Sequence, residues 1–220
     1  MRIKIITDSV SDIPNEIIGE LNIEVLPLSV NFEDASYYDR VELTNIEFFN
    51  KLKNSKKIPT TSQVNPGEFK KAFEIFLESF DQIICITMSK EMSGTFKAAN
   101  IAKKLLNTDR IRVFDSKAIS FGFGLIVINA ARDVKANKDY DEIIDNINYN
   151  IENLENIFII DTLEFLQKGG RLSVTEAFVG SVLKMKPILT IRNGKLEVMS
   201  KVRGRKKAIN YVVKYLKDKE

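Results

Sequence analysis

Residues 82–99, QIICITMSKEMSGTFKAA, contain the pattern that decides the fold. The apolar run at residues 82–87 is typical of a buried strand, and the segment after the polar loop predicts a helix that runs to about Leu106. A strand that leads through a polar loop into a helix is the repeating unit of α/β folds. Residues 93–95, Ser-Gly-Thr, would then place hydroxyl groups beside the unpaired amides of a helix N-terminus, where the macrodipole favours a negative charge.

A second segment rich in hydroxyl groups, PTTSQ at residues 59–63, forms a polar turn upstream of this strand. In the folded chain this turn could meet residues 93–95 in space. Both segments offer hydrogen-bond donors, and the chain contains no histidine. Together they predict a protein that holds an acidic head group and does not cleave bonds.

The composition is that of an ordinary soluble globular protein, with 44% hydrophobic and 29% charged residues in a chain of 220. The absence of histidine excludes Ser-His-Asp and Cys-His catalysis and removes the commonest zinc ligand.

The single cysteine, Cys85, is predicted to be a buried strand residue. One cysteine forms no internal disulfide, and the N-terminus runs directly into a strand without a secretory signal, so we expect a cytoplasmic protein. The longest apolar stretch, residues 118–131, is too short to span a bilayer.

Strands and helices alternate along the first part of the chain, which predicts a mainly parallel sheet flanked by helices. Strands are expected within residues 2–12, 23–32, 82–87, 110–116 and 156–161, and helices within residues 13–22, 43–55, 65–80, 93–106, 120–135 and 140–154. Thr44 and Pro14 are typical of helix starts. The last part, residues 186–220, predicts a hairpin that turns at Asn193-Gly194, followed by an amphipathic helix. We place a domain boundary near Asn153, with an N-terminal α/β domain at residues 1–153 and a second α/β domain at residues 154–220.

Three polar loops follow strands of the predicted parallel sheet: TDSVSD at residues 7–12, TMSKEMSGT at 87–95 and DSKAIS at 115–120. The carboxyl ends of parallel strands share one edge of a sheet, and ligands bind at that edge in open α/β folds. The coincidence of the three loops therefore locates the candidate site.

The individual polar residues do not form a known catalytic motif. Asp8 and Asp12 lack the D-x-D spacing of aspartyl phosphatases, and a lone aspartate at a strand end usually holds a loop by accepting hydrogen bonds from backbone amides. Ser93 lies in EMSGT, which lacks the first glycine of G-x-S-x-G, and has no histidine to activate it. Residues 168–171, KGGR, lack the spacing of a Walker A loop and form a glycine turn with two cations.

Two other classes of function stay open at this point. A phosphoryl- or acyl-transfer enzyme could use Asp8 or Ser93, with a metal ion on Asp8 and Asp115. A protein- or nucleic-acid-binding module could use the basic C-terminal region, which carries ten cationic and three acidic residues from Arg192 onward. The tyrosines of that region, Tyr211 and Tyr215, are four residues apart and could face the core, which argues against nucleic acid.

Six motifs in order along the whole chain resemble the DegV family: TDSVSD, PTTSQ, SGTFKAA, FDSKAISFG, LQKGGRLS and KPILTIRNGKLE. The resemblance implies a two-domain α/β protein of bacteria that binds a long-chain fatty acid between its domains. Such proteins act as the binding subunit of a fatty-acid kinase and present the carboxylate to a separate catalytic protein. Members usually continue beyond this point, with further strands and a histidine near the head group, so the resemblance implies a second domain that is C-terminally incomplete.

The family's carboxylate-binding hydroxyls correspond to Thr61 and Ser93, with Ser62, Gly94 and Thr95 as the supporting head-group loop. The resemblance further implies no catalytic residue, cofactor or metal of the protein's own, no nucleic-acid partner and at most transient contact with a membrane surface. The acyl tail would lie along the glycine-containing apolar segments at residues 119–128 and 176–185. Arg171 and Arg203 are expected to contact an acyl phosphate or the kinase partner, or else to bind loop carbonyls.

Overall fold

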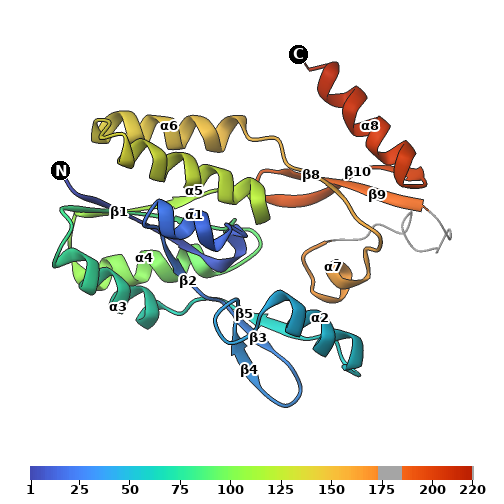
Figure 1. Ribbon diagram of the computed structural model, residues 1–220, viewed down its shortest axis with the longest axis horizontal. Helices are drawn as coiled ribbons and strands as arrows, with labels where there is room; N and C mark the ends of the chain where they lie inside the picture. Colours follow the sequence, from blue (N-terminus) through green and yellow to red (C-terminus); the bar gives the residue numbers. More distant parts are fainter. Residues whose placement is uncertain (173–184, 220) are drawn as a thin grey trace. The chain divides into compact units, whose positions relative to one another are not determined.

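The main sheet contains four parallel strands in the order β2-β1-β6-β7. Its strands are β1 (Ile3–Asp8), β2 (Glu24–Leu26), β6 (Gln82–Thr87) and β7 (Ile111–Asp115). The computed structural model describes residues 1–172 and 185–219, and the chain divides into two units, Met1–Leu154 and Glu155–Glu220. The parallel sheet confirms the predicted fold class and lies in the first unit (Figure 1).

Helices cover both faces of this sheet, with α3 and α4 on one face and α5 and α6 on the other (Figure 1). Their bounds are α1 (Asn15–Glu20), α3 (Pro66–Leu77), α4 (Thr95–Leu106), α5 (Ser120–Lys135) and α6 (Tyr140–Asn153). The core between the layers consists of branched aliphatic strand residues and of aromatic and small helix residues, among them Phe69, Phe73, Ala99 and Phe123, which are fully buried. Cys85 is also fully buried within β6, as the sequence predicted.

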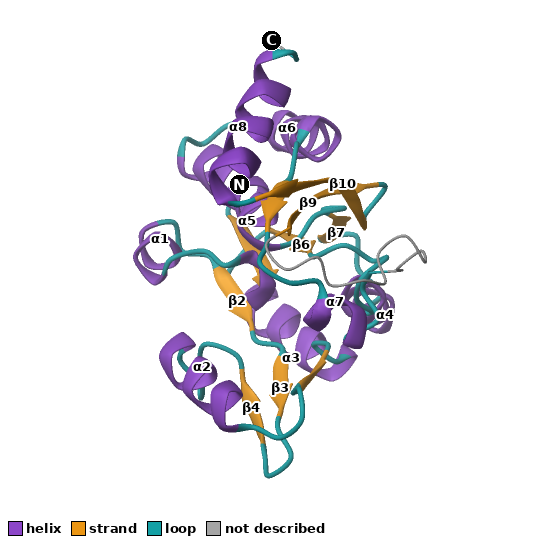
Figure 2. Cartoon of the chain, turned by 90° about the vertical axis from the view of Figure 1, so that its right-hand side faces the viewer, coloured by secondary structure: helices purple, strands orange, loops and turns teal. Residues whose placement is uncertain are grey.

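A small antiparallel sheet with the order β4-β3-β5 follows β2, and helix α2 (Asn45–Asn54) lies beside it (Figure 2). Its strands are β3 (Ser29–Asn31), β4 (Ser36–Tyr38) and β5 (Thr60–Ser62). The prediction of one continuous strand over residues 23–32 was wrong. Proline has no backbone N–H to continue a ladder, and at Pro27 the chain leaves the main sheet and enters the small one.

The segment PTTSQ is also not a turn, because its residues 60–62 form strand β5. Thr61 lies opposite Val30 in the antiparallel register with β3. β-branched residues such as threonine suit a pleated strand, so the composition of this segment is compatible with either conformation. Its pairing with β3 decides between them, and that pairing joins residues about thirty positions apart.

The second unit contains an antiparallel sheet with the order β10-β9-β8. Its elements are β8 (Ile157–Ile159), α7 (Glu164–Lys168), β9 (Met185–Arg192), β10 (Lys195–Arg203) and α8 (Arg205–Lys217). Asn193 and Gly194 connect β9 to β10 with φ values of 49° and 79°. Positive φ at both central residues is typical of a type I′ hairpin turn, which confirms the predicted hairpin. Within the described ranges, no helix is both long and apolar enough to cross a membrane.

Helix α5 approaches the loop after β1 very closely, because Gly124 has no side chain. A Cβ atom at this position would overlap the carbonyl oxygen of Ser11 and lie 3.2 Å from Cγ1 of Ile13. Ser11 ends a short 3₁₀ helix, Ser9–Ser11, that follows β1 directly. The glycine therefore lets the backbone of the loop pack on the surface of α5.

We predict that Gly124→Ala lowers the free energy of unfolding by about 1–3 kcal/mol, because the added methyl group meets rigid backbone and forces the helix and the loop apart. Gly19→Ala in α1 is the matched control, since nothing lies within 4 Å of the added Cβ atom there. The control should be neutral or stabilising by up to about 1 kcal/mol. Urea unfolding followed by circular dichroism measures both. Equal midpoints for Gly124→Ala and the parent chain would contradict the close approach.

Candidate functional site

The two hydroxyl-rich segments meet in the structure through the contact of Gln63 with Gly94. A Cβ atom on Gly94 would overlap Oε1 of Gln63 and lie 2.8 Å from its Cδ and 3.1 Å from its Nε2. The carboxamide of Gln63 therefore rests against the bare backbone at the start of α4. This contact confirms the expectation that the segment at residues 59–63 and the segment at residues 93–95 lie together.

Ser93 and Thr95 form a pair of hydroxyl groups at the N-terminus of α4. Their Oγ and Oγ1 atoms are 2.9 Å apart, and the backbone N–H of Thr95 donates to Ser93 Oγ at 3.3 Å. Thr95 is fully buried, whereas Ser93 and Gly94 are half-buried. The partners of the Ser93 hydroxyl are thus a hydroxyl and an amide, and neither can take its proton to make it a nucleophile.

On the other side, the hydroxyl groups of β5 differ in their surroundings. Ser62 Oγ accepts a hydrogen bond from Nδ2 of Asn31 at 2.9 Å, so this hydroxyl ties β5 to its neighbour β3. Thr61 is exposed. Successive side chains of a strand point to opposite faces, so within β5 the side chain of Thr61 lies on the face opposite that of Ser62, and Gln63 follows the strand directly.

The N-terminus of α4 lacks a side-chain cap. Its N-cap residue is Gly94, with φ −74° and ψ 2°, which has no side chain to accept a hydrogen bond from the first-turn amides. Helices α2 and α3 instead begin with complete capping boxes, formed by Thr44 with Glu47 and by Asn65 with Glu68. The first-turn amides that follow Thr95 are therefore available to an external acceptor, and the helix dipole makes an anion the favoured one.

Asp8 holds the loops beside the site and is fully buried. Its Oδ2 accepts a hydrogen bond from Met88 N at 2.8 Å, and its Oδ1 accepts one from Val10 N at 3.1 Å. Burial raises the pKa of this carboxyl to about 7, against the two hydrogen bonds, which lower it. The sequence-based interpretation of Asp8 as a residue that holds a loop is confirmed. A buried carboxyl with both oxygens bound to backbone is poorly placed to attack a substrate.

Three further hydrogen bonds, two on Asp115 and one between Ser120 and Asp12, complete a ring among the three polar loops. Asp115 Oδ1 accepts from Lys90 N at 3.1 Å and from Lys117 N at 3.0 Å. Ser120 Oγ donates to Asp12 Oδ2 at 2.6 Å. The loop at residues 7–12 thus binds the loop at 87–95 through Asp8, the latter binds the loop at 115–120 through Asp115, and Ser120 returns to Asp12. The predicted meeting of these loops is confirmed.

The other expected site residues lie in different surroundings. Phe123, Ile126 and Val127, from the apolar segment at residues 119–128, are buried in the core of the first unit. Residues 176–184, from the second apolar segment, lie outside the described residues. Arg171 and Arg203 belong to the second unit, where Nη1 of Arg171 donates to the carbonyl oxygen of Gly169.

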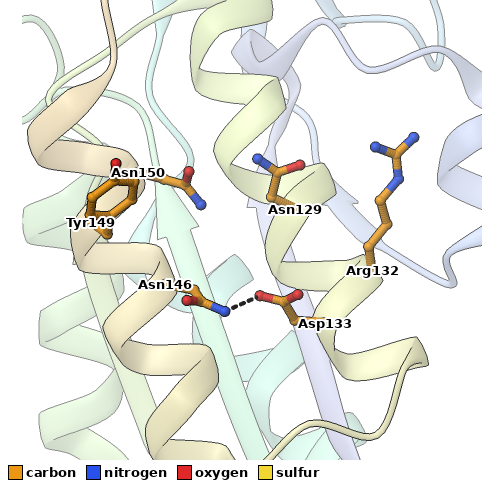
Figure 3. Close-up of a pocket in the computed structure, with 6 residues that line it drawn as sticks. All are labelled: Asn129, Arg132, Asp133, Asn146, Tyr149 and Asn150. Atoms are coloured by element: carbon orange, nitrogen blue, oxygen red, sulfur yellow. Dashed lines mark hydrogen bonds between the residues drawn. The ribbon is translucent and has the colours of Figure 1, made fainter.

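A separate polar hollow of about 280 Å³ lies between α5 and α6 (Figure 3). Its lining residues are Asn129, Arg132, Asp133, Asn146, Tyr149 and Asn150. The side chains of Asn129 and Asn150 project into the space between the helices, and Asn146 Nδ2 donates to Asp133 at 2.8 Å. The hollow shares no residue with the hydroxyl segments, so it is distinct from the candidate site.

Sequence reasoning missed two residues of the site, Gln63 and Asn31. Gln63 was visible as the last residue of PTTSQ, and its distance of two positions from Thr61 was the available signal once the segment is a strand. Asn31 lies thirty-one residues from Ser62 in the sequence. No local pattern connects the two, and only the pairing of β3 with β5 brings them together.

The chain is similar to known proteins over nearly all of its length. The sequence model of a family described as "Uncharacterised protein, DegV family" matches residues 2–220. A DegV domain-containing protein of Caldanaerobacter subterraneus subsp. tengcongensis is 41% identical over 99% of this chain and 77% of its own.

Two solved structures have the same fold. A DegV family protein from Thermus thermophilus, described for its fatty acid binding, has a TM-score of 0.91 at 34% identity and covers 99% of this chain and 78% of its own. DegV from Bacillus subtilis, described as a fatty acid binding protein, has a TM-score of 0.87 at 35% identity, with 100% and 78% covered. These likenesses extend over both units of the chain.

We predict that Asp8 makes the protein less stable as the pH rises from about 4 to about 7. Its carboxyl keeps a proton in the folded state up to about pH 7, whereas in the unfolded chain it loses that proton near its ordinary pKa of 3.8. The folded state then binds more protons than the unfolded state, so the free energy of unfolding falls by up to about 1.4 kcal/mol per pH unit.

Urea unfolding of the parent chain and Asp8→Asn at several pH values tests this prediction. The variant leaves one backbone N–H without its acceptor and should be less stable at pH 5 by about 1–3 kcal/mol. The difference in the free energy of unfolding between the parent and the variant should shrink toward pH 8, because the protonated Asp8 carboxyl no longer stabilises the parent at that pH. Other carboxyl groups titrate in both proteins and cancel in the comparison. A difference that stays constant from pH 5 to pH 8 would show that Asp8 is already ionised in the fold at pH 5.

Proposed function

The chain belongs to the DegV family, and on this premise we propose that it binds a long-chain fatty acid whose carboxylate accepts hydrogen bonds from Thr61 and Ser93. The observation that carries the proposal is the contact of Gln63 with Gly94, which joins the strand of Thr61 to the uncapped N-terminus that follows Ser93. Gly94 and Thr95 would support the head group through the backbone and hydroxyl groups of this helix start. The fatty-acid binding described for the solved relatives supports the same ligand.

The chemistry of the site suits a carboxylate. Hydroxyl groups donate to its two oxygens, and the positive end of the α4 dipole stabilises its charge. Ser93 is bonded to a hydroxyl and an amide and not to a base, and Asp8 is buried with both oxygens bound. Such a site stabilises an anion and has no means to transform it, so we infer that the protein has no catalytic residue and needs no cofactor of its own.

The acyl tail would supply most of the affinity. Burial of about fourteen methylene groups stabilises a complex by roughly 11 kcal/mol before the costs of association are subtracted. A hydrogen bond contributes about 1 kcal/mol, or about twice that when the acceptor is charged. We therefore expect the tail to set the affinity, while Thr61 and Ser93 set the position of the head group.

We further propose that the protein presents this carboxylate to a fatty-acid kinase, a separate catalytic protein that phosphorylates it. Arg171 and Arg203 would then contact the acyl phosphate or the kinase, since guanidinium groups match phosphate oxygens with paired donors. Arg171 also donates to the carbonyl of Gly169, so its role in the loop competes with this one. A cytoplasmic location suits the free thiol of Cys85, and exchange of the acid would need only transient contact with a membrane surface.

We predict that the purified protein carries a saturated or monounsaturated fatty acid of about sixteen to eighteen carbons, because a tail of this length supplies the burial estimated above. Organic extraction followed by mass spectrometry identifies the acid, and native mass spectrometry gives its stoichiometry. Added palmitate should raise the melting temperature of the delipidated protein. A protein that contains no fatty acid and does not respond to palmitate would contradict the proposed function.

We also predict that Ser93→Ala reduces phosphorylation of the bound acid by the kinase more than it reduces binding of the acid. One lost hydrogen bond is small beside the burial of the tail, whereas transfer needs the carboxylate in one orientation. Binding should weaken by no more than about tenfold. Titration with a fluorescent fatty acid and a phosphorylation assay measure the two effects separately. Equal losses in both assays would show that the head group dominates binding.

A further inference from the structure

The contact between Gln63 and Gly94 has a second property that bears on ligand choice. The atoms that approach Gly94 are Oε1, Cδ and Nε2 of Gln63, which form the planar carboxamide at the end of a flexible side chain. Gly94 itself has a φ of −74°, which any residue can adopt. Glycine is therefore not required at position 94 by the backbone. What its missing side chain provides is space for the carboxamide.

This carboxamide connects the two hydroxyl groups of the proposed site. Gln63 follows Thr61 by two positions, directly beyond the end of β5, and Gly94 follows Ser93 directly. Between them, Ser62 points the other way and is bound to Asn31. The placement of Thr61 relative to Ser93 thus depends on how the side chain of Gln63 seats on Gly94.

We propose that Gln63 is a positioning residue that makes the site select a carboxylate head group. Gly94, which lacks a side chain, provides the space that the Gln63 carboxamide occupies. While it contacts Gly94, the carboxamide sets the separation between the end of β5 and the Ser93 turn. Donors on two separate segments suit the two charged oxygens of a carboxylate better than the one neutral oxygen of an alcohol. The inference rests on the proposed function, because it names what makes that same site specific.

Gly94→Ala separates this role from the stability of the fold. The three atoms nearest the new methyl group belong to the far end of Gln63, an exposed and flexible side chain that can move away from it. The backbone conformation tolerates alanine, so the variant should fold and lose only the seated carboxamide. Gln63→Ala removes the same carboxamide without adding a group at position 94. The double variant then tests whether both changes act through the one contact.

The experiment compares the affinity for palmitate with that for hexadecanol, measured by displacement of a fluorescent fatty acid from the delipidated parent chain, Gly94→Ala, Gln63→Ala and the double variant. Each single variant should bind palmitate about five- to tenfold more weakly, the equivalent of one hydrogen bond to a charged acceptor, and hexadecanol unchanged. The double variant should match either single variant. Gly19→Ala, where the added Cβ atom meets nothing within 4 Å, should bind both ligands like the parent.

Three outcomes would overturn the proposal. Unchanged palmitate binding in both single variants would show that the contact of Gln63 with Gly94 has no role in ligand choice. Equal weakening for palmitate and hexadecanol would make the contact merely structural. Losses that multiply in the double variant would show that the methyl group added at position 94 blocks the ligand directly. A parent chain that binds neither ligand would instead contradict the proposed function, and this result is distinct from the other three.

Discussion

The arrangement of the first unit depends on a ring of side-chain hydrogen bonds at the carboxyl edge of its parallel sheet. Asp8 binds the amide of Met88, Asp115 binds the amide of Lys90, and Ser120 binds Asp12. Each bond joins loops that follow different strands, so the three loops are fixed relative to one another as well as to the sheet. Asp8 is the most constrained member, because burial opposes its charge while two backbone amides favour it. The helix that carries the candidate site begins immediately after one of these loops.

Two glycines determine how closely the elements around this ring can approach. Gly124 brings α5 against the backbone of Ser11, where a side chain would meet rigid atoms. Gly94 brings the residue after β5 against the start of α4, where the atoms nearest an added side chain would belong to the flexible end of Gln63. The first approach serves packing, and we propose that the second serves the site. The difference lies in what a methyl group would displace, which is backbone in one place and a mobile carboxamide in the other.

The physical character of the candidate site follows from what surrounds its hydroxyl groups. Ser93 contacts another hydroxyl and an amide, and the helix that follows it has no side-chain cap. Donors and a positive dipole stabilise an anion but do not remove a proton from a nucleophile. The candidate site is therefore suited to an anion such as a carboxylate. In the proposed function, burial of the apolar tail contributes affinity without directing the head group.

The sequence by itself determined the parallel sheet, its flanking helices, the β9–β10 hairpin and the three loops at one edge, because hydrophobic periodicity, capping residues and the Asn193-Gly194 turn are local signals. It also identified Asp8 as a residue that holds a loop. The division of residues 23–32 at Pro27 has a local cause, the missing N–H of proline, which the prediction of one continuous strand did not take into account. Only the tertiary structure decided that residues 60–62 form a strand and that the Gln63 carboxamide contacts Gly94. Both depend on a contact between segments far apart in the chain. Such contacts follow from the packing of whole elements, which no local pattern specifies.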